Sequence, residues 1–258
     1  MPRKSTASIR LSERMKSITR MVTPGMRVCD LGCDHGFVSI YLAKENIAPS
    51  VLAMDIGKGP LAQAQLHIEE AGLSDRITTR LSDGLKQYQE GEADCLIIAG
   101  MGGPLMQEIL SDKKAESFEE LVLSPQSEIA EFRKFLTDRG LQIIAEDMIC
   151  EDEKYYQIMK ARWSRKENVA SGSITTPDTK QEEIECRFGP LLLAQRHPVL
   201  KQYLEKEEHK YIRLLTLLKG YEGEKIQARR NTLEKELFFV RIALQEMEGE
   251  GSYGEYYN

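Results

Sequence analysis

The stretch that decides the fold is Val28-Cys-Asp-Leu-Gly-Cys-Asp-His-Gly-Phe37. An apolar strand is predicted to lead up to Asp30. A tight turn follows, formed by Gly32 and Gly36, and an amphipathic helix is predicted from Phe37. A strand, a glycine turn and a helix start allow the backbone to approach a nucleotide-like ligand closely. A plain turn without a ligand gives a similar pattern, so the prediction of a ligand site depends on the rest of the chain.

The spacing of the two glycines separates this turn from the dinucleotide-binding type. It reads D-x-G-x-x-x-G, whereas a dinucleotide-binding turn reads G-x-G-x-x-G. It resembles the first motif of class I S-adenosylmethionine (SAM) methyltransferases, (D/E)-x-G-x-G-x-G, except that Asp34 replaces the middle glycine.

Composition indicates a globular protein of one large domain, or of one domain and a smaller module. The chain has 258 residues, of which 41% are hydrophobic and 29% are charged. Its apolar runs are too short to span a bilayer, and its first residues lack the apolar core of a secretory signal. The five cysteines are scattered without C-x-x-C spacing, which argues against disulfides and a zinc site. We therefore expect a cytoplasmic protein without a metal or a membrane partner.

Charge is distributed unevenly along the chain. The net charge is -6, yet residues 1–27 hold seven basic side chains and only one acidic side chain, Glu13. A basic arm of this kind can contact phosphates while the rest of the protein remains acidic. The alternative is an ordinary solvated helix face.

The order of the predicted elements indicates a doubly wound α/β sheet of seven strands. An amphipathic helix is predicted over 7–22, before alternating strands and helices. The last two strands are separated only by a turn, so we expect an antiparallel hairpin. Strands are expected at 26–31, 50–55, 76–80, 93–99, 119–124, 141–147 and 154–161, and helices at 36–46, 58–72, 103–112 and 127–139.

The pattern changes after residue 163. Residues 164–198 begin with a polar stretch rich in Ser, Thr and Lys and are predicted to be a linker or exposed loop. Over 199–258, two runs of apolar residues at helical spacing flank a glycine turn, and Arg230 interrupts the second run. This predicts an antiparallel coiled-coil hairpin with a frayed tail from Gly249. Such a hairpin buries its own seam and favours a monomer. The predicted domains are therefore 1–163 and 199–258.

Acidic residues at the ends of two further strands fit a bound nucleoside. Asp55 ends the second strand, where a carboxylate can hold two ribose hydroxyls. Ser82, Asp83 and Gly84 follow the third strand, where an aspartate can accept a hydrogen bond from an adenine amino group. The alternatives are a helix cap at Asp55 and a simple turn at Asp83 and Gly84.

The ends of the fourth and fifth strands limit the chemistry. Ala99-Gly-Met-Gly-Gly-Pro104 opens space for a flat group and lacks the (N/D/S)-P-P-(Y/F) motif common in enzymes that methylate exocyclic amines. Ser124-Pro125-Gln126 can place an amide beside a base or cap the next helix. Neither end has the cysteine needed for methylation at pyrimidine C5, or a lysine suited to ribose methylation. The adenine N1 atom has a free lone pair and needs no general base, so it fits this site.

Together these motifs resemble the bacterial TrmK family, SAM-dependent enzymes that methylate N1 of adenosine 22 in tRNA. The resemblance covers essentially the whole chain, and Asp34 is normal for this family. It is carried by these segments: Leu11-Ser-Glu-Arg-Met-Lys-Ser-Ile18, Asp30-Leu-Gly-Cys-Asp-His-Gly36, Asp55, Ser82-Asp-Gly84, Ala99-Gly-Met-Gly-Gly103 and Ser124-Pro-Gln126.

The resemblance implies a role for each matched position. The first turn would surround the methionine moiety of SAM, Asp55 would hold the ribose, and Asp83 with Gly84 would hold the adenine. The implied cofactor-binding residues are Asp30, Gly32, Asp34, His35, Gly36, Asp55, Ile56, Asp83 and Gly84. Asp34, His35, Gly100, Met101 and Gly102 would position the reactants without a general base. The residues that would contact tRNA are Arg10, Arg14, Arg20, Arg229 and Arg230. Arg10 and Arg14 would alternatively contact the pocket.

Two other functions remain open from the sequence. One is a class I methyltransferase that acts on another RNA nucleoside or on a small molecule. The other is a SAM-binding or coiled-coil interaction protein without activity, although the expected ligand positions are all present.

Overall fold

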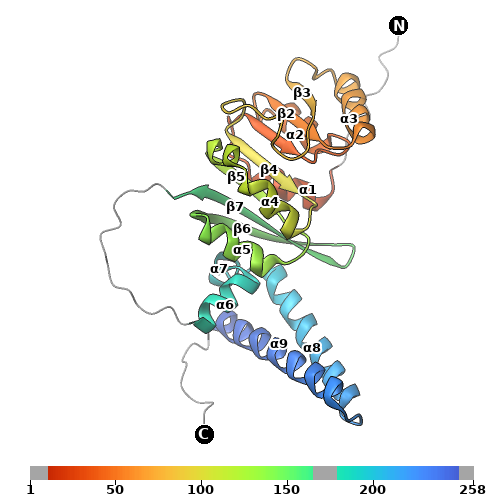
Figure 1. The fold of residues 1–258 in the computed structure, drawn as a ribbon, viewed down its shortest axis with the longest axis vertical. Coiled ribbons are helices and arrows are strands. Elements are labelled where there is room, and N and C mark those ends of the chain that lie inside the picture. The colour runs from red at the N-terminus through yellow and green to blue at the C-terminus, as the bar shows by residue number, and fades with distance from the viewer. Residues whose placement is uncertain (1–10, 165–178, 250–258) are drawn as a thin grey trace, which may run out of the picture. The chain divides into compact units, whose positions relative to one another are not determined.

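The computed structural model describes residues 11–164 and 179–249. The chain forms two compact units, residues 1–170 and 171–258, and each is described by itself (Figure 1).

A seven-stranded sheet forms the centre of the first unit, in the order β3-β2-β1-β4-β5-β7-β6. Strands β1 to β5 pair in parallel, whereas β7 runs antiparallel to both β5 and β6. This confirms the predicted doubly wound sheet and its closing hairpin. The strands are β1 (Val28–Leu31), β2 (Val51–Asp55), β3 (Ile77–Leu81), β4 (Cys95–Ala99), β5 (Glu120–Ser124), β6 (Leu141–Glu151) and β7 (Lys154–Trp163).

Helices cover both faces of this sheet (Figure 1). Alternate residues of each central strand enter different cores, as the two-residue period of a strand requires. Cys29 and Leu31 pack with α4 and α5, whereas Val28 packs with α1, α2 and α3. The helices are α1 (Glu13–Met21), α2 (Phe37–Lys44), α3 (Lys58–Ala71), α4 (Gly103–Ser111) and α5 (Ile129–Asp138), and a 3-10 turn, η1, spans Lys113–Ser117. Both faces of β1, β4 and β5 are buried, which explains their nearly continuous apolar sequences.

Helix α1 begins later than the predicted residue 7, because Ser12 is its N-cap and accepts a hydrogen bond from the backbone N–H of Met15. Residues 7–10 lie outside the described residues. The helix is fixed to the sheet by polar contacts as well as by apolar packing. The side chain of Ser17 donates to Asp147 on β6.

The segment after α1 is held by a buried carboxylate. Glu120 on β5 accepts hydrogen bonds from the backbone N–H and hydroxyl of Thr23, at 3.0 and 2.7 Å. It also pairs with Lys160 and Arg162 of β7, at 3.0 and 3.1 Å. These partners satisfy a carboxylate that is fully buried, and they hold its pKa below the ordinary value although burial alone would raise it.

The second unit contains the predicted helical hairpin. Its arms are α8 (Pro198–Leu218) and α9 (Glu224–Glu248), and Leu200, Leu204, Leu233 and Leu237 are buried there. The charged group of Arg241 on α9 contacts Glu208 on α8 at 2.8 Å. The predicted coiled-coil arms are therefore present. The residues of the tail after Gly249 lie outside the described residues.

The prediction of a linker over 164–198 was wrong for its second half. Helices α6 (Thr179–Phe188) and α7 (Pro190–Ala194) form there and contact α9. The few apolar residues of this stretch are concentrated on buried positions, Ile184, Phe188, Leu192 and Leu193. Its polar composition hid this pattern. Residues 165–178, which include the polar stretch itself, lie outside the described residues.

Within the described ranges no helix has both the length and the apolarity that a membrane span requires. Nor do three or more His, Cys, Asp or Glu side chains in these ranges gather as a metal site would require.

Candidate functional site

Two cavities meet at the carboxyl-terminal ends of the parallel strands, and both are lined by Gly32 and Met101. The first has a volume of about 230 Å3 and lies beside the ends of β2 and β3. The second has a volume of about 340 Å3 and lies between α1, the turn after β1 and the loop after β4. They lie where the chain changes direction between β1 and β4, which is where open α/β sheets bind ligands.

Asp30 is a buried residue of β1 and lines the second cavity. Its carboxylate accepts a hydrogen bond of 2.6 Å from the hydroxyl of Ser39 on α2. Burial raises the pKa of Asp30 from about 3.8 to about 6, against the opposing effect of the Ser39 hydrogen bonds. Near neutral pH the Asp30 carboxylate is therefore negatively charged, which suits a cationic group bound in the second cavity.

The backbone conformation of the turn after β1 explains the unusual sequence of this turn. Gly32 has a φ of +77°, and a Cβ there would collide with the terminal methyl of Met101. Gly36 has a φ of +75°, and a Cβ there would lie 3.0 Å from Cβ of Ala64 on α3. Asp34, where the general motif has glycine, has a φ of +51°. Aspartate adopts this left-handed conformation more readily than most residues, so Asp34 preserves the path of the turn.

Asp34 also connects the turn to the end of β2. Its backbone N–H donates to one oxygen of the Asp55 carboxylate at 3.0 Å, and the N–H of Gly57 donates to the other at 2.7 Å. These bonds fix the orientation of Asp55 at the edge of the first cavity, where it can accept two hydroxyl donors. His35 lines the second cavity, and its Nε2 atom lies 3.5 Å from the Asp34 carboxylate.

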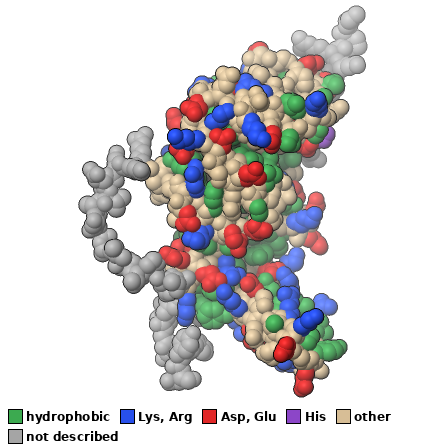
Figure 2. Space-filling model, in the orientation of Figure 1, with side chains coloured by type: hydrophobic (Ala, Val, Ile, Leu, Met, Phe, Trp, Pro, Cys, Tyr) green, Lys and Arg blue, Asp and Glu red, His purple; other side chains and the backbone are tan. Residues whose placement is uncertain are grey.

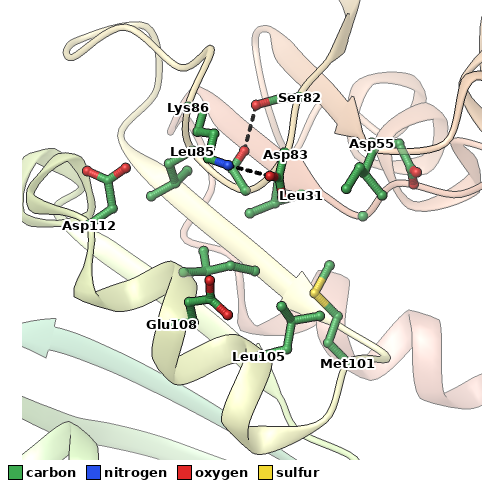
Figure 3. A pocket seen from close by; sticks show the side chains of 14 residues that line it. Leu31, Asp55, Ser82, Asp83, Leu85, Lys86, Met101, Leu105, Glu108 and Asp112 are labelled. Atoms are coloured by element: carbon green, nitrogen blue, oxygen red, sulfur yellow. Dashed lines mark hydrogen bonds and ion pairs between the residues drawn. The ribbon is translucent and has the colours of Figure 1, made fainter.

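The remaining wall of the first cavity comes from two sides. Figure 3 shows Met101, Leu105 and Glu108 facing the loop that carries Asp83 and Lys86 across the cavity. Lys86 forms an ion pair with Asp83. The predicted residues Asp55, Ile56, Asp83 and Gly84 all line this cavity, and Ile56 is 68% exposed, which leaves an apolar surface available to a flat ring.

The second cavity is lined both by the loop after β4, through Gly100 and Met101, and by helix α1, through Arg14. The guanidinium carbon of Arg14 lies 4.6 Å from the centre of the Tyr156 ring, an arrangement that favours a cation–π contact. Its Nε atom is buried and has no hydrogen-bond partner among residues 11–164 and 179–249. The second guanidinium nitrogen lies 3.2 Å from the point that a Cβ of Gly100 would occupy. Arg14 is thus the cation on the wall of this cavity.

Several predicted site residues lie elsewhere. Gly36 and Gly102 are not among the cavity-lining residues of the described ranges, and they shape the backbone instead. Arg20 is exposed on α1. Arg229 and Arg230 belong to the second unit, where the guanidinium of Arg230 donates to the carbonyls of Leu218 and Tyr221 and closes the hairpin turn. Arg10 lies outside the described residues.

Sequence reasoning missed part of the lining. Leu105 and Glu108 face the first cavity from α4, and Phe37 and Met15 face the second from α2 and α1. Leu105 and Glu108 are three residues apart on α4, and helical spacing predicts that such residues share one face of the helix. Gln126 lines the second cavity. This position agrees with the prediction that its amide lies beside a bound base.

Comparisons with known proteins agree with this geometry. Residues 11–159 match the family described as a methyltransferase domain. The tRNA (adenine(22)-N(1))-methyltransferase of Bacillus subtilis (strain 168) is 28% identical over 204 residues, which cover 78% of this chain and 83% of that relative.

Solved structures extend the likeness to the second unit. A Streptococcus pneumoniae protein, a candidate tRNA (m1A22) methyltransferase solved with SAM, is 28% identical with a TM-score of 0.76. The match covers 91% of this chain and all of that one. TrmK of Bacillus subtilis superposes with a TM-score of 0.74 at 24% identity, over 92% of this chain and all of that one, and so shares the fold. The family model matches more than half of the chain, so this chain belongs to the methyltransferase-domain family, and its likeness to the m1A22 relatives identifies it as a member of the TrmK family.

Proposed function

We propose that this protein transfers a methyl group from SAM to N1 of adenosine 22 in tRNA. The observation that carries the proposal is the meeting of the two cavities at Gly32 and Met101. A molecule that extends across this junction can hold its nucleoside beside Asp55 and Asp83 and its amino-acid part beside Asp30. The named activity of the Bacillus subtilis relative supports the choice of acceptor.

The residues of the site fit SAM. Asp55 is oriented by two backbone N–H groups, and Asp83 and Gly84 lie on the same cavity, as a ribose and an adenine require. The Asp30 carboxylate lines the second cavity, where its negative charge suits the ammonium group of the amino-acid part. When bound, SAM supplies an electrophilic methyl group on a sulfonium.

The second cavity fits a flat acceptor that needs no general base. Gly100 has no side chain and leaves space between Arg14 and Gln126. The N1 lone pair of adenine can accept the methyl group directly, so the protein must orient the base rather than remove a proton. We assign Asp34, His35, Gly100 and Met101 to this orientation, while Gly102 shapes the loop.

Binding of tRNA requires positive surface outside the cavities. Of the basic residues on α1, Lys16 pairs with Glu13, whereas Arg20 is exposed, and Arg14 lies at the cavity. The N-terminal charge is therefore only partly available within the described residues. We infer that Arg14 and Arg20 contact tRNA from this unit.

The turn end of the α8–α9 hairpin, residues 209–230, offers a second positive surface. It contains six Lys or Arg residues and two Glu residues, although the hairpin as a whole is nearly balanced. Tyr221 and Leu217 are 63% and 60% exposed there. Figure 2 shows basic and hydrophobic side chains close together over this hairpin. Cations beside an exposed aromatic ring suit phosphates and an unpaired base. Among the described residues, Lys210 of this end pairs with Glu207 and Arg230 donates to two carbonyls. The other four cations of this end have neither an ion pair nor a side-chain hydrogen bond there: Arg213, Lys219, Lys225 and Arg229.

The decisive experiment uses methyl-labelled SAM with unmodified tRNA, followed by digestion and identification of the modified nucleoside. We expect 1-methyladenosine at position 22, and no label in a matched tRNA that has guanosine there. The variant Asp55→Asn should reduce SAM binding and labelling together. Label on another nucleoside, or only on a small-molecule acceptor, would contradict the proposal. A tRNA substrate also implies action in the cytoplasm, and we expect a monomer in light scattering.

A further inference from the structure

The loops after β4 and β5 form one wall of the second cavity because their backbones are bonded to each other. The N–H of Gly100 donates to the carbonyl of Ser124 at 3.3 Å, and the N–H of Gln126 donates to that of Met101 at 2.9 Å. The N–H of Gly103 donates to the carbonyl of Ser127 at 3.2 Å. This set of bonds fixes where the Gln126 side chain begins.

The Gln126 amide faces the space above Gly100. Its nitrogen lies 3.8 Å from the point that a Cβ of Gly100 would occupy, and a nitrogen of Arg14 lies 3.2 Å from the same point. The amide forms no hydrogen bond with the described residues, so both its oxygen and its nitrogen can bind a ligand. A flat group above Gly100 would therefore lie between an amide and a guanidinium.

The proposed reaction determines which edge of the base the protein can read. Attack from N1 turns the Watson–Crick edge of adenine toward the methyl donor. The 6-amino group and N7 then remain for recognition, and a glutamine amide matches them with one acceptor and one donor. Guanine presents two acceptors on this edge, O6 and N7, so the amide oxygen would face O6.

We propose that Gln126 selects the target adenine: its Oε1 atom accepts a hydrogen bond from the 6-amino group, and its Nε2 atom donates one to N7. This inference rests on the proposed function and adds a residue that determines specificity. Gln126 orients the base and takes no part in bond formation or bond breaking.

The test combines enzyme variants with a substrate that lacks one acceptor. Two tRNAs are compared, one with adenosine and one with 7-deazaadenosine at position 22, in single-turnover methylation at saturating SAM. Removal of N7 should slow the unaltered protein by about tenfold. For Gln126→Ala, we expect a lower rate on adenosine and almost no further loss on the analogue. For Gln126→Glu, which accepts but cannot donate, the analogue should react faster than adenosine.

Two controls separate this role from a structural one. Gln63 is exposed on α3 away from both cavities, and Gln63→Ala should respond to the analogue as the unaltered protein does. The affinity of Gln126→Ala for SAM should be unchanged in calorimetry. An equal loss on 7-deazaadenosine in the unaltered protein and in Gln126→Ala would overturn the inference. Failure of the unaltered protein to methylate ordinary tRNA would instead contradict the proposed function.

Discussion

Asp30 is the residue whose ionisation should control cofactor binding. Its pKa of about 6 means that it loses its negative charge as the pH falls through 6. We therefore expect the affinity for SAM to decrease over this range, measured by calorimetry between pH 5 and 8. In Ser39→Ala, loss of the hydrogen bond that lowers the pKa of Asp30 should move the midpoint to higher pH. A midpoint that stays in place would show that another group controls binding.

Folding stability should respond to Asp30 with a defined sign. The folded protein keeps this proton to about pH 6, whereas the unfolded chain loses it near pH 3.8. Between these values the folded state binds more protons, so the Asp30 contribution makes the free energy of unfolding fall as the pH rises. The total change is about 3 kcal/mol at most, since one pKa unit corresponds to about 1.4 kcal/mol. Urea unfolding of Asp30→Asn should lack this component.

At the scale of elements, the close contact between the loops after β4 and β5 should be essential for activity. A Cβ on Gly103 would lie 2.6 Å from the carbonyl oxygen of Ser127, a backbone atom that cannot move aside alone. Gly103→Ala should separate the loops, lower the free energy of unfolding by about 1–3 kcal/mol and reduce methyl transfer strongly.

Gly59→Ala is the matched control for this change. A Cβ on Gly59 meets no atom within 4 Å, and the residue lies in helix α3. Activity should be retained and stability should be equal or slightly higher, because alanine is the better helix former. Thermal unfolding and single-turnover rates measure both effects. Full activity in Gly103→Ala would contradict the role of the loop contact.

At the scale of the whole molecule, we propose that the first unit binds the methyl donor and that the hairpin of the second unit adds contacts to RNA. Reversal of two unpaired cations at the turn end of the hairpin, Lys219→Glu with Lys225→Glu, should raise the KM for tRNA by about tenfold or more and leave SAM affinity unchanged. It should also flatten the salt dependence of tRNA binding, since fewer phosphate contacts release fewer counterions.

A control with the same change in net charge is available in the first unit. Lys44 is exposed at the end of α2, and Lys58 is exposed at the start of α3. The double variant Lys44→Glu with Lys58→Glu changes the net charge by the same amount away from the hairpin. An equal loss of tRNA binding in this control would show that overall charge, and not the hairpin, is responsible. Removal of residues 199–258 is a poorer experiment, because α6 and α7 contact α9 and would lose their partner.

The sequence by itself determined the α/β order, the glycine turn after β1 and the hairpin arms, because each depends on local patterns. Apolar runs in β1, β4 and β5, glycines at 32 and 36, and the spacing of Leu233 and Leu237 are all readable along the chain. The same holds for Asp55 and Asp83, since the ends of parallel strands meet at one edge of a sheet.

Only the tertiary structure decided which of these residues act together. Arg14, Gly100 and Gln126 are far apart in sequence and converge only through the packing of α1 and two loops against the sheet. Arg230 belongs to the hairpin turn because its guanidinium finds two carbonyls there. Helices α6 and α7 depend on burial against α9 rather than on a strong local signal. Such contacts are set by packing in three dimensions, which residue types and their spacing do not specify.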